Sequence, residues 1–125
     1  MLGDYLAIGT GGFLGAIARY AVAGWAADRF GSQFPYGTLI INVSGSLVIG
    51  IFLAAITGRF APPPQIRLVF AVGFLGAYTT FSTFSYEALA LLRAGSFLPA
   101  AQYILGHLVL GLGAVAVGFL VGRSL

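Results

Sequence analysis

A run of hydroxyl and phenyl side chains interrupts an otherwise apolar stretch of this sequence. Residues 79–85 read Thr-Thr-Phe-Ser-Thr-Phe-Ser, and they lie inside the apolar stretch from Leu68 to Leu92. β-branched, aromatic and serine residues have low helix propensities, and hydroxyls without partners are costly in hydrocarbon. Such a segment persists at membrane depth only where it is buried in protein or lines a pathway. The run therefore predicts a broken helix at a functional centre.

The side chains of this run have the chemistry to hold a small ion. Phe81 and Phe84 are three residues apart, so they share a helix face on which the positive edges of the rings could contact an anion. Core packing is the other explanation for such a phenylalanine pair. Possible hydrogen-bond donors are Thr79, Thr80, Ser82, Thr83 and Ser85. At a helix break, freed carbonyls could coordinate a cation and freed amides an anion.

A second set of polar residues follows one face of the preceding apolar stretch. Thr38, Asn42 and Ser46 are spaced four residues apart, so they line one side of a helix. A lone membrane asparagine often only bonds a neighbouring helix. Three polar groups in register, on a helix that packs beside the hydroxyl run, favour a polar track.

Ionisable residues inside membrane spans are functional candidates by default. Arg19 and Glu87 are the two charged residues well inside the apolar stretches. The alternative for each is a structural pair or a group that reaches the interface. His107 follows Tyr103 by four residues in the last stretch. Packing with a hydrogen bond is the common role of such a histidine, and a pore-facing role is the alternative.

The composition identifies an all-α integral membrane protein. Of 125 residues, 59% are hydrophobic and 7% are charged, with a mean hydropathy of +1.00. A soluble domain of this size with so little charge on its surface would aggregate. Cysteine is absent, which excludes a disulfide framework. One histidine and three acids are too few ligands for a transition-metal centre. The six arginines are scattered, which argues against nucleic acid as a partner. The sequence contains no nucleophile–base pair and no set of catalytic metal ligands, so an enzyme is not expected.

Four apolar stretches are long enough to cross a bilayer, which takes roughly 20 residues. They run from about Tyr5 to Ala26, Tyr36 to Thr57, Leu68 to Leu92, and Phe97 to Val121. The connections between them are short, so neighbouring helices should be antiparallel within a single domain covering residues 1–125. The pairs Gly11/Gly15 and Gly118/Gly122 have the small-xxx-small spacing of close helix packing in lipid.

A bundle of four helices has too little interior to bury these polar groups, which predicts a dimer. With both termini on one side, that side carries Arg59, Arg67 and Arg123, and the opposite side carries Arg29, Arg93 and the more deeply placed Arg19. Positive-inside bias is nearly absent. A chain without bias can insert in both orientations, so we expect an antiparallel, dual-topology dimer surrounded by lipid.

Three ordered motifs resemble the Fluc (CrcB) family of microbial fluoride channels. The first is Gly12-x-x-Gly15-Ala16-x-x-Arg19-Tyr20, the second is Gly37-Thr38-Leu39-x-x-Asn42-x-x-Gly45, and the third runs from Gly73-Phe74-x-Gly76 through the hydroxyl run to Glu87. The likeness covers the first three spans in order, and the length and the four-helix layout agree with it.

The resemblance implies passive export of cytoplasmic fluoride, and hence fluoride resistance, through the cell membrane. It places Asn42, Phe81 and Phe84 along the fluoride pathways of an antiparallel dimer. It also implies a structural sodium ion at the dimer centre, held by main-chain carbonyls of Gly76 and Thr79. The full set of predicted pathway residues is Asn42, Phe81, Phe84, Thr38, Ser82, Thr83, Tyr103 and His107.

The last span departs from the family pattern. The family often continues its pathway with hydroxyl side chains after a tyrosine, whereas Tyr103 is followed here at helical spacing by His107, Gly111 and Val115. Either this channel is lined differently, or the chain is a non-conducting partner subunit that needs a paralogue to complete a pore.

Two other functions fit the sequence less well than a channel does. A small dual-topology multidrug exporter needs a deep carboxylate, typically in the first span, where only Asp4 lies, at the edge. A structural subunit of a larger membrane complex suits glycine-rich spans but does not account for a helix-breaking hydroxyl run.

Overall fold

The computed structural model describes all 125 residues as helices joined by short connections. The first two spans are α1 (Leu2–Phe30) and α2 (Tyr36–Thr57). The third span is assembled from α3 (Pro64–Arg67), the π-helix η1 (Leu68–Leu75), α4 (Gly76–Tyr78) and α5 (Phe81–Arg93). The fourth span is α6 (Phe97–Ser124). All four predicted spans are therefore confirmed; the bounds of the second match, and the other three extend by a few residues at their ends.

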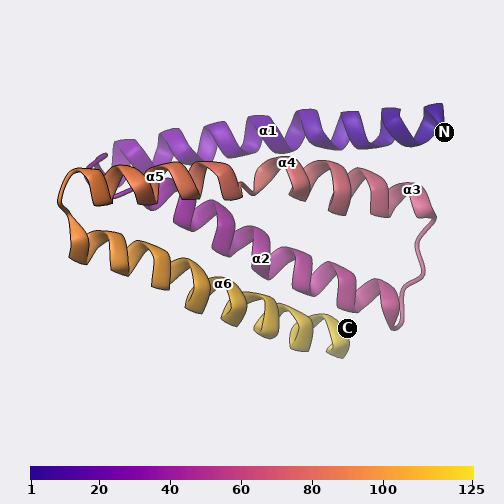
Figure 1. Cartoon of the computed structure of the whole chain (residues 1–125). Helices are drawn as coiled ribbons and strands as arrows, with labels where there is room; N and C mark the ends of the chain where they lie inside the picture. The colour runs from indigo at the N-terminus through magenta and orange to yellow at the C-terminus, as the bar shows by residue number, and fades with distance from the viewer.

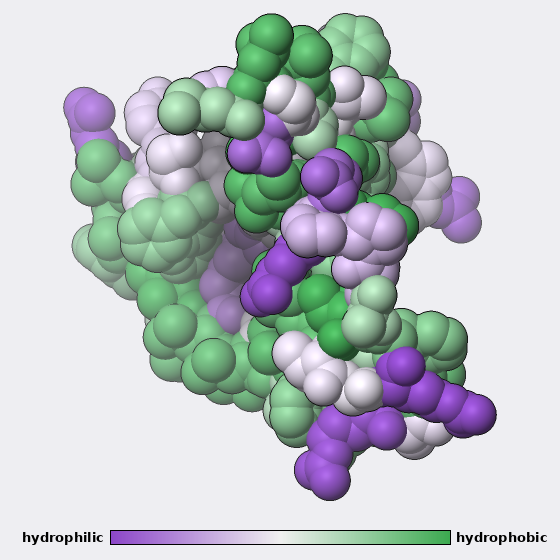
Figure 2. Space-filling model, turned by 90° about the vertical axis from the view of Figure 1, so that its right-hand side faces the viewer, coloured by the Kyte–Doolittle hydropathy of each residue, from purple (hydrophilic) through white to green (hydrophobic).

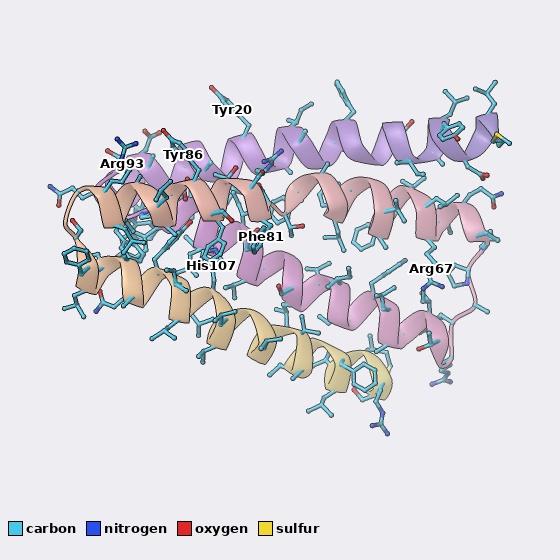
Figure 3. All side chains as sticks on the ribbon, viewed as in Figure 1. Tyr20, Arg67, Phe81, Tyr86, Arg93 and His107 are labelled. Carbon is cyan, nitrogen blue, oxygen red and sulfur yellow. The ribbon has the colours of Figure 1, made fainter.

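The four spans lie side by side with alternating direction (Figure 1). α1 packs along η1 and α4, whereas α2 packs mainly against α6. The two chain ends lie towards the same end of the bundle in Figure 1, and Arg67 and Arg93 mark opposite ends of the third span in Figure 3. The topology thus places three arginines at each end if Arg19 is counted, as the sequence predicts.

Glycine gives these helices their close contacts. A Cβ atom added to Gly11 would lie 1.9 Å from the Val69 carbonyl oxygen, and one added to Gly15 would lie 2.1 Å from that of Phe74. On the other side of the bundle, a Cβ on Gly118 would meet the Leu47 carbonyl oxygen at 2.3 Å. Both predicted small-residue pairs therefore let backbones touch, which is the usual basis of helix association in lipid.

The third span breaks at its centre, as the hydroxyl run predicts. Thr79 and Thr80 are extended, with φ/ψ of −81°/157° and −153°/117°, and α5 begins immediately after them. The Thr80 hydroxyl oxygen accepts a hydrogen bond from the Thr83 N–H at 3.1 Å, which makes Thr80 the N-cap of α5. The wider π-helical turns of η1 precede the break, so the span departs from a regular α-helix over Leu68–Leu75 and again at Thr79 and Thr80.

Little of the chain is buried, because a thin bundle leaves most side chains on its outside. Only 15 of 125 residues are buried, and the largest fully buried side chains are Tyr103 and Ile41. Figure 2 shows that hydrophobic groups dominate the surface of the body, while strongly hydrophilic groups project at the end facing the viewer. This distribution is that of a multi-pass membrane protein.

Candidate functional site

The carboxamide of Asn42, on α2, holds the break of the third span from both sides. Its Oδ1 accepts the Thr80 N–H at 2.8 Å, and its Nδ2 donates to the Thr80 carbonyl oxygen at 3.0 Å. An extended residue inside a helical span loses its regular backbone partners, and buried groups of this kind are costly when left unpaired. Asn42 supplies both partners, so the polar face of α2 fixes the position of the break.

His107, on α6, joins this arrangement from the opposite side. Its Nδ1 lies 3.0 Å from the Tyr103 carbonyl oxygen, and its Nε2 lies 3.1 Å from Nδ2 of Asn42. A carbonyl only accepts hydrogen bonds, so Nδ1 of His107 carries the hydrogen. In the neutral ring Nε2 is then the acceptor, and Asn42 donates to it. Three helical segments are thereby connected through two side chains.

A second polar network lies next to the first and is centred on Glu87. The Tyr103 hydroxyl donates to Oε2 of Glu87 at 2.5 Å, and the Thr38 hydroxyl donates to Oε1 at 3.1 Å. Tyr103 is fully buried and Thr38 is 6% exposed. Both carboxylate oxygens therefore have a donor. Thr38 and Tyr103, predicted as pathway residues, are placed here as partners of Glu87.

An aromatic cluster forms one wall of the site. The Phe84 ring lies between three others, at centroid distances of 4.2 Å from His107, 5.5 Å from Tyr103 and 5.6 Å from Phe81. Phe81 itself is 79% exposed. Figure 3 shows Phe81 beside the break and His107 on the adjacent α6. The structure brings together the two phenylalanines and the histidine that the sequence singled out.

Two cavities flank the break. The first, of about 390 Å³, is lined by polar and aromatic groups from α2, the third span and α6. Its principal lining residues are Asn42, Ser46, Thr79, Thr80, Phe81, Phe84 and His107. The second, of about 320 Å³, has Thr38, Thr80, Thr83, Arg19 and Glu87 in its wall. Because Thr80 lines both, the predicted polar track of α2 continues across the break from one cavity to the other.

Arg19 and Glu87 share the second cavity without forming an ion pair. The only ion pair of the chain joins the N-terminus to Asp4 at 3.7 Å. The Glu87 carboxylate is already engaged by two hydroxyls, as described above. Arg19 is partly exposed on α1 and contributes a positive charge to the cavity wall. Arg19 and Glu87 therefore do not form a structural pair with each other within the single chain.

The break also frees main-chain oxygens. Thr80 donates its N–H to Asn42 instead of to the carbonyl of Gly76 four residues before it, and the extended Thr79 does not continue the helix. Carbonyl oxygens are ligands that suit a hard cation such as sodium. No group of three His, Cys, Asp or Glu side chains gathers anywhere in the chain. The carbonyls of Gly76 and Thr79 thus fit the predicted cation site in chemistry and in their place at the break.

Some contacts at the site had no clear sign in the sequence. The Ser44 hydroxyl lies 2.9 Å from the Tyr78 hydroxyl and ties α2 to α4 just before the break. Gly45 lies under Thr79, whose Cγ2 would be 2.3 Å from a Cβ on that glycine. Ser44 lies off the Thr38–Asn42–Ser46 face, so the helical periodicity that identified the track did not include it.

Ser82, which the sequence predicts as a pathway residue, is exposed and lines neither of the two cavities in the single chain.

Comparison with known proteins gives a consistent result. The family model described as CrcB-like protein, Camphor Resistance (CrcB), matches residues 6–119. A protein of Chloroflexus aurantiacus named "Fluoride-specific ion channel FluC" is 47% identical over 122 residues, covering 98% of this chain and 97% of that protein. Proteins with the same name from Acidobacterium capsulatum and Solibacter usitatus are 45% and 44% identical, and they cover 97% and 95% of this chain.

Proposed function

We propose that this chain, which belongs to the CrcB-like protein family, is a passive fluoride-selective ion channel that exports cytoplasmic fluoride and confers fluoride resistance. The observation that carries the proposal is the broken third span, held by Asn42 and bordered by Phe81 and Phe84 at a cavity. Relatives that are 43–47% identical over nearly the whole chain carry the name of a fluoride-specific channel, which supports it. The microbial plasma membrane is the location that such export requires.

Selectivity for fluoride follows from the kind of donors around the cavity. A small, strongly hydrated anion enters a pore only where close donors replace its water. Ser46 lines the cavity with a hydroxyl that no other residue of the chain engages, and phenyl edges of Phe81 and Phe84 add weak positive potential. Larger halides fit a narrow track of such groups poorly. We therefore assign first contact with fluoride to Ser46 and the two rings.

We infer that the working unit is an antiparallel dimer of this chain. One face of α5 exposes groups poorly suited to lipid alone, including Ser82 and Ser85 beside Phe81, and Tyr86 is 74% exposed. Phe81 also lines the first cavity. A second copy would cover this surface and close the pathway. The nearly equal arginine counts at the two ends support opposite orientations of the two copies.

We also propose a structural sodium ion where the breaks of the two copies meet. The Gly76 and Thr79 carbonyl oxygens of both chains would hold it, as their chemistry permits. When bound, the ion supplies positive charge that offsets the converging carbonyl dipoles. In this proposal the sodium ion is structural and is not transported.

The multidrug-exporter alternative is disfavoured by the state of the one deep carboxylate. Proton-coupled export needs a carboxylate that is free to exchange protons for a cationic drug. Both oxygens of Glu87 accept hydrogen bonds from the Tyr103 and Thr38 hydroxyls instead. A non-conducting partner subunit remains the other reading of the altered last span, and flux from the purified chain alone separates it from the channel.

Growth of a fluoride-sensitive bacterial host tests the proposed function. Expression of the chain should restore growth in fluoride and leave ethidium tolerance unchanged, because no exchangeable carboxylate is available. Phe81→Ile should remove the restored growth and lower fluoride flux by about tenfold or more, a barrier change of about 1.4 kcal/mol, since the aromatic edge is lost.

The matched control is Phe97→Ile, which makes the same change at a 68% exposed side chain at the start of α6. It should behave like the unmodified chain. Ethidium tolerance that follows the gene, or fluoride tolerance that is unaffected by Phe81→Ile, would contradict the assignment.

A further inference from the structure

We propose that protonation of His107 converts its contact with Asn42 into an anion site, so that fluoride flux through this chain rises as the pH falls. The inference rests on the proposed function and adds a mode of regulation to it. It concerns His107, one of the residues at which this chain departs from the family pattern of the last span.

The carboxamide of Asn42 has no free donor hydrogen while His107 is neutral. The two N–H hydrogens of its carboxamide point to the Thr80 carbonyl and to Nε2 of His107, at 3.0 and 3.1 Å. Its Oδ1 accepts the Thr80 N–H. A carboxamide has two donor hydrogens, so none remains for an anion. In the neutral state of His107, the amide donors of Asn42 are all used within the protein.

Protonation reverses the role of one partner. A proton added to Nε2 of His107 turns that atom from an acceptor into a donor, while Nδ1 keeps its hydrogen bond to the Tyr103 carbonyl. Two donors then face each other across the former contact, and the Asn42–His107 hydrogen bond cannot persist. One N–H from each residue becomes available, and a small anion that accepts both restores the lost hydrogen bonds.

The surroundings of His107 allow both the charge and the anion. The imidazole borders the cavity of about 390 Å³ at the break, which gives access to an ion. The Phe84 ring centroid is 4.2 Å from the imidazole, within the range at which a cation is attracted to an aromatic ring. The anion itself would neutralise the added positive charge.

The ionisable groups near His107 come from two helices. Glu87 on α5 approaches through Tyr103, whose hydroxyl bonds the carboxylate and whose carbonyl bonds Nδ1 of His107. Tyr103 is the other such group on α6. From α2 the facing groups, Thr38 and Asn42, are not ionisable. Arg19 on α1 borders the neighbouring cavity with Glu87 and does not line the cavity of His107.

Fluoride efflux from liposomes containing the purified chain tests the proposal at about pH 7.5 and pH 5.5, which span the range where histidine titrates. We expect flux to rise by at least about tenfold at the lower pH, because the two conditions differ by two pH units and each unit changes the population of a sparsely protonated imidazole by up to about tenfold. Protein-free liposomes at each pH correct for hydrogen fluoride that crosses lipid by itself. His107→Gln removes the ionisable group and should make the flux independent of pH.

A second measurement does not depend on a variant. His107 is the only histidine of the chain, so ¹⁵N-histidine labelling gives a single imidazole whose protonation is read by NMR. If the protonated form binds fluoride, then fluoride must increase the protonated fraction at a fixed pH, and chloride must not. An equal protonated fraction in fluoride and chloride would overturn the proposal.

The outcomes separate this inference from the proposed function. Fluoride flux that is equal at both pH values, or that falls on acidification, would overturn the histidine switch and leave the channel intact. Absence of flux at every pH from the folded chain would overturn both. Flux that rises with acid in the unmodified chain and is flat in His107→Gln, with fluoride-dependent protonation, would support the switch.

Discussion

Replacing Asn42 with alanine should abolish fluoride flux and destabilise the broken span. The substitution removes both the Oδ1 that accepts the Thr80 N–H at 2.8 Å and the Nδ2 that donates to the Thr80 carbonyl oxygen at 3.0 Å. Each partly buried group left without a partner costs about 1–3 kcal/mol. The two backbone groups of Thr80 are the ones that α2 holds in place, so the break should lose its fixed geometry together with the pathway beside it.

Efflux measurements and thermal unfolding in detergent check this prediction together. Asn42→Asp keeps an acceptor for the Thr80 N–H and has no donor when ionised. The stability of this variant should therefore fall between that of Asn42→Ala and that of the unmodified chain. Ser46→Ala is the matched control for stability, since Ser46 lies one turn along the same face and, unlike Asn42, makes no hydrogen bond to the break. Normal flux and normal stability in Asn42→Ala would show that the carboxamide does not hold the break.

Replacing Gly118 with alanine should separate α2 from α6 and prevent stable folding. The new Cβ would lie 2.3 Å from the Leu47 carbonyl oxygen and 3.0 Å from the Ile51 nitrogen. Both are backbone atoms, so no side chain can rotate to relieve the contact. Overpacking of this kind costs about 1–3 kcal/mol, occasionally more. Because α2 carries Asn42 and α6 carries His107, a shift between the helices should also disrupt the site.

Gly113→Ala provides the control on the same helix. An added Cβ at Gly113 has nothing within 4 Å, and alanine is favoured over glycine in a helix by about 1 kcal/mol. We expect yield and unfolding temperature to fall for Gly118→Ala and to stay equal or rise for Gly113→Ala. Equal behaviour of the two variants would contradict the close packing of α2 on α6.

The elements were predictable from the sequence because their causes are local. The second span is bounded by Pro35 and Gly58, and its predicted range of Tyr36–Thr57 matches α2. The break at Thr79 and Thr80 follows from β-branched residues and hydroxyls in an apolar stretch. The glycine contacts follow from a four-residue spacing. Each of these signals lies within a few residues of the feature it predicts.

The partners within the site could not be predicted, because they depend on the register between helices. The spacing of Thr38 and Asn42 indicated a polar face, but only the relative position of α2 and the third span directs one to Glu87 and the other to Thr80. The acceptor role of His107 follows from the nearby carbonyl of its own helix. The π-helical turns of η1 have no local marker in the residues that form them.

The most direct test of the account is anion efflux from liposomes that contain only this purified chain, with fluoride and chloride compared in the same preparation. A fluoride channel formed by copies of this chain predicts rapid loss of fluoride while chloride is retained. Retention of both anions by a well-folded preparation, or equal loss of both, would contradict it.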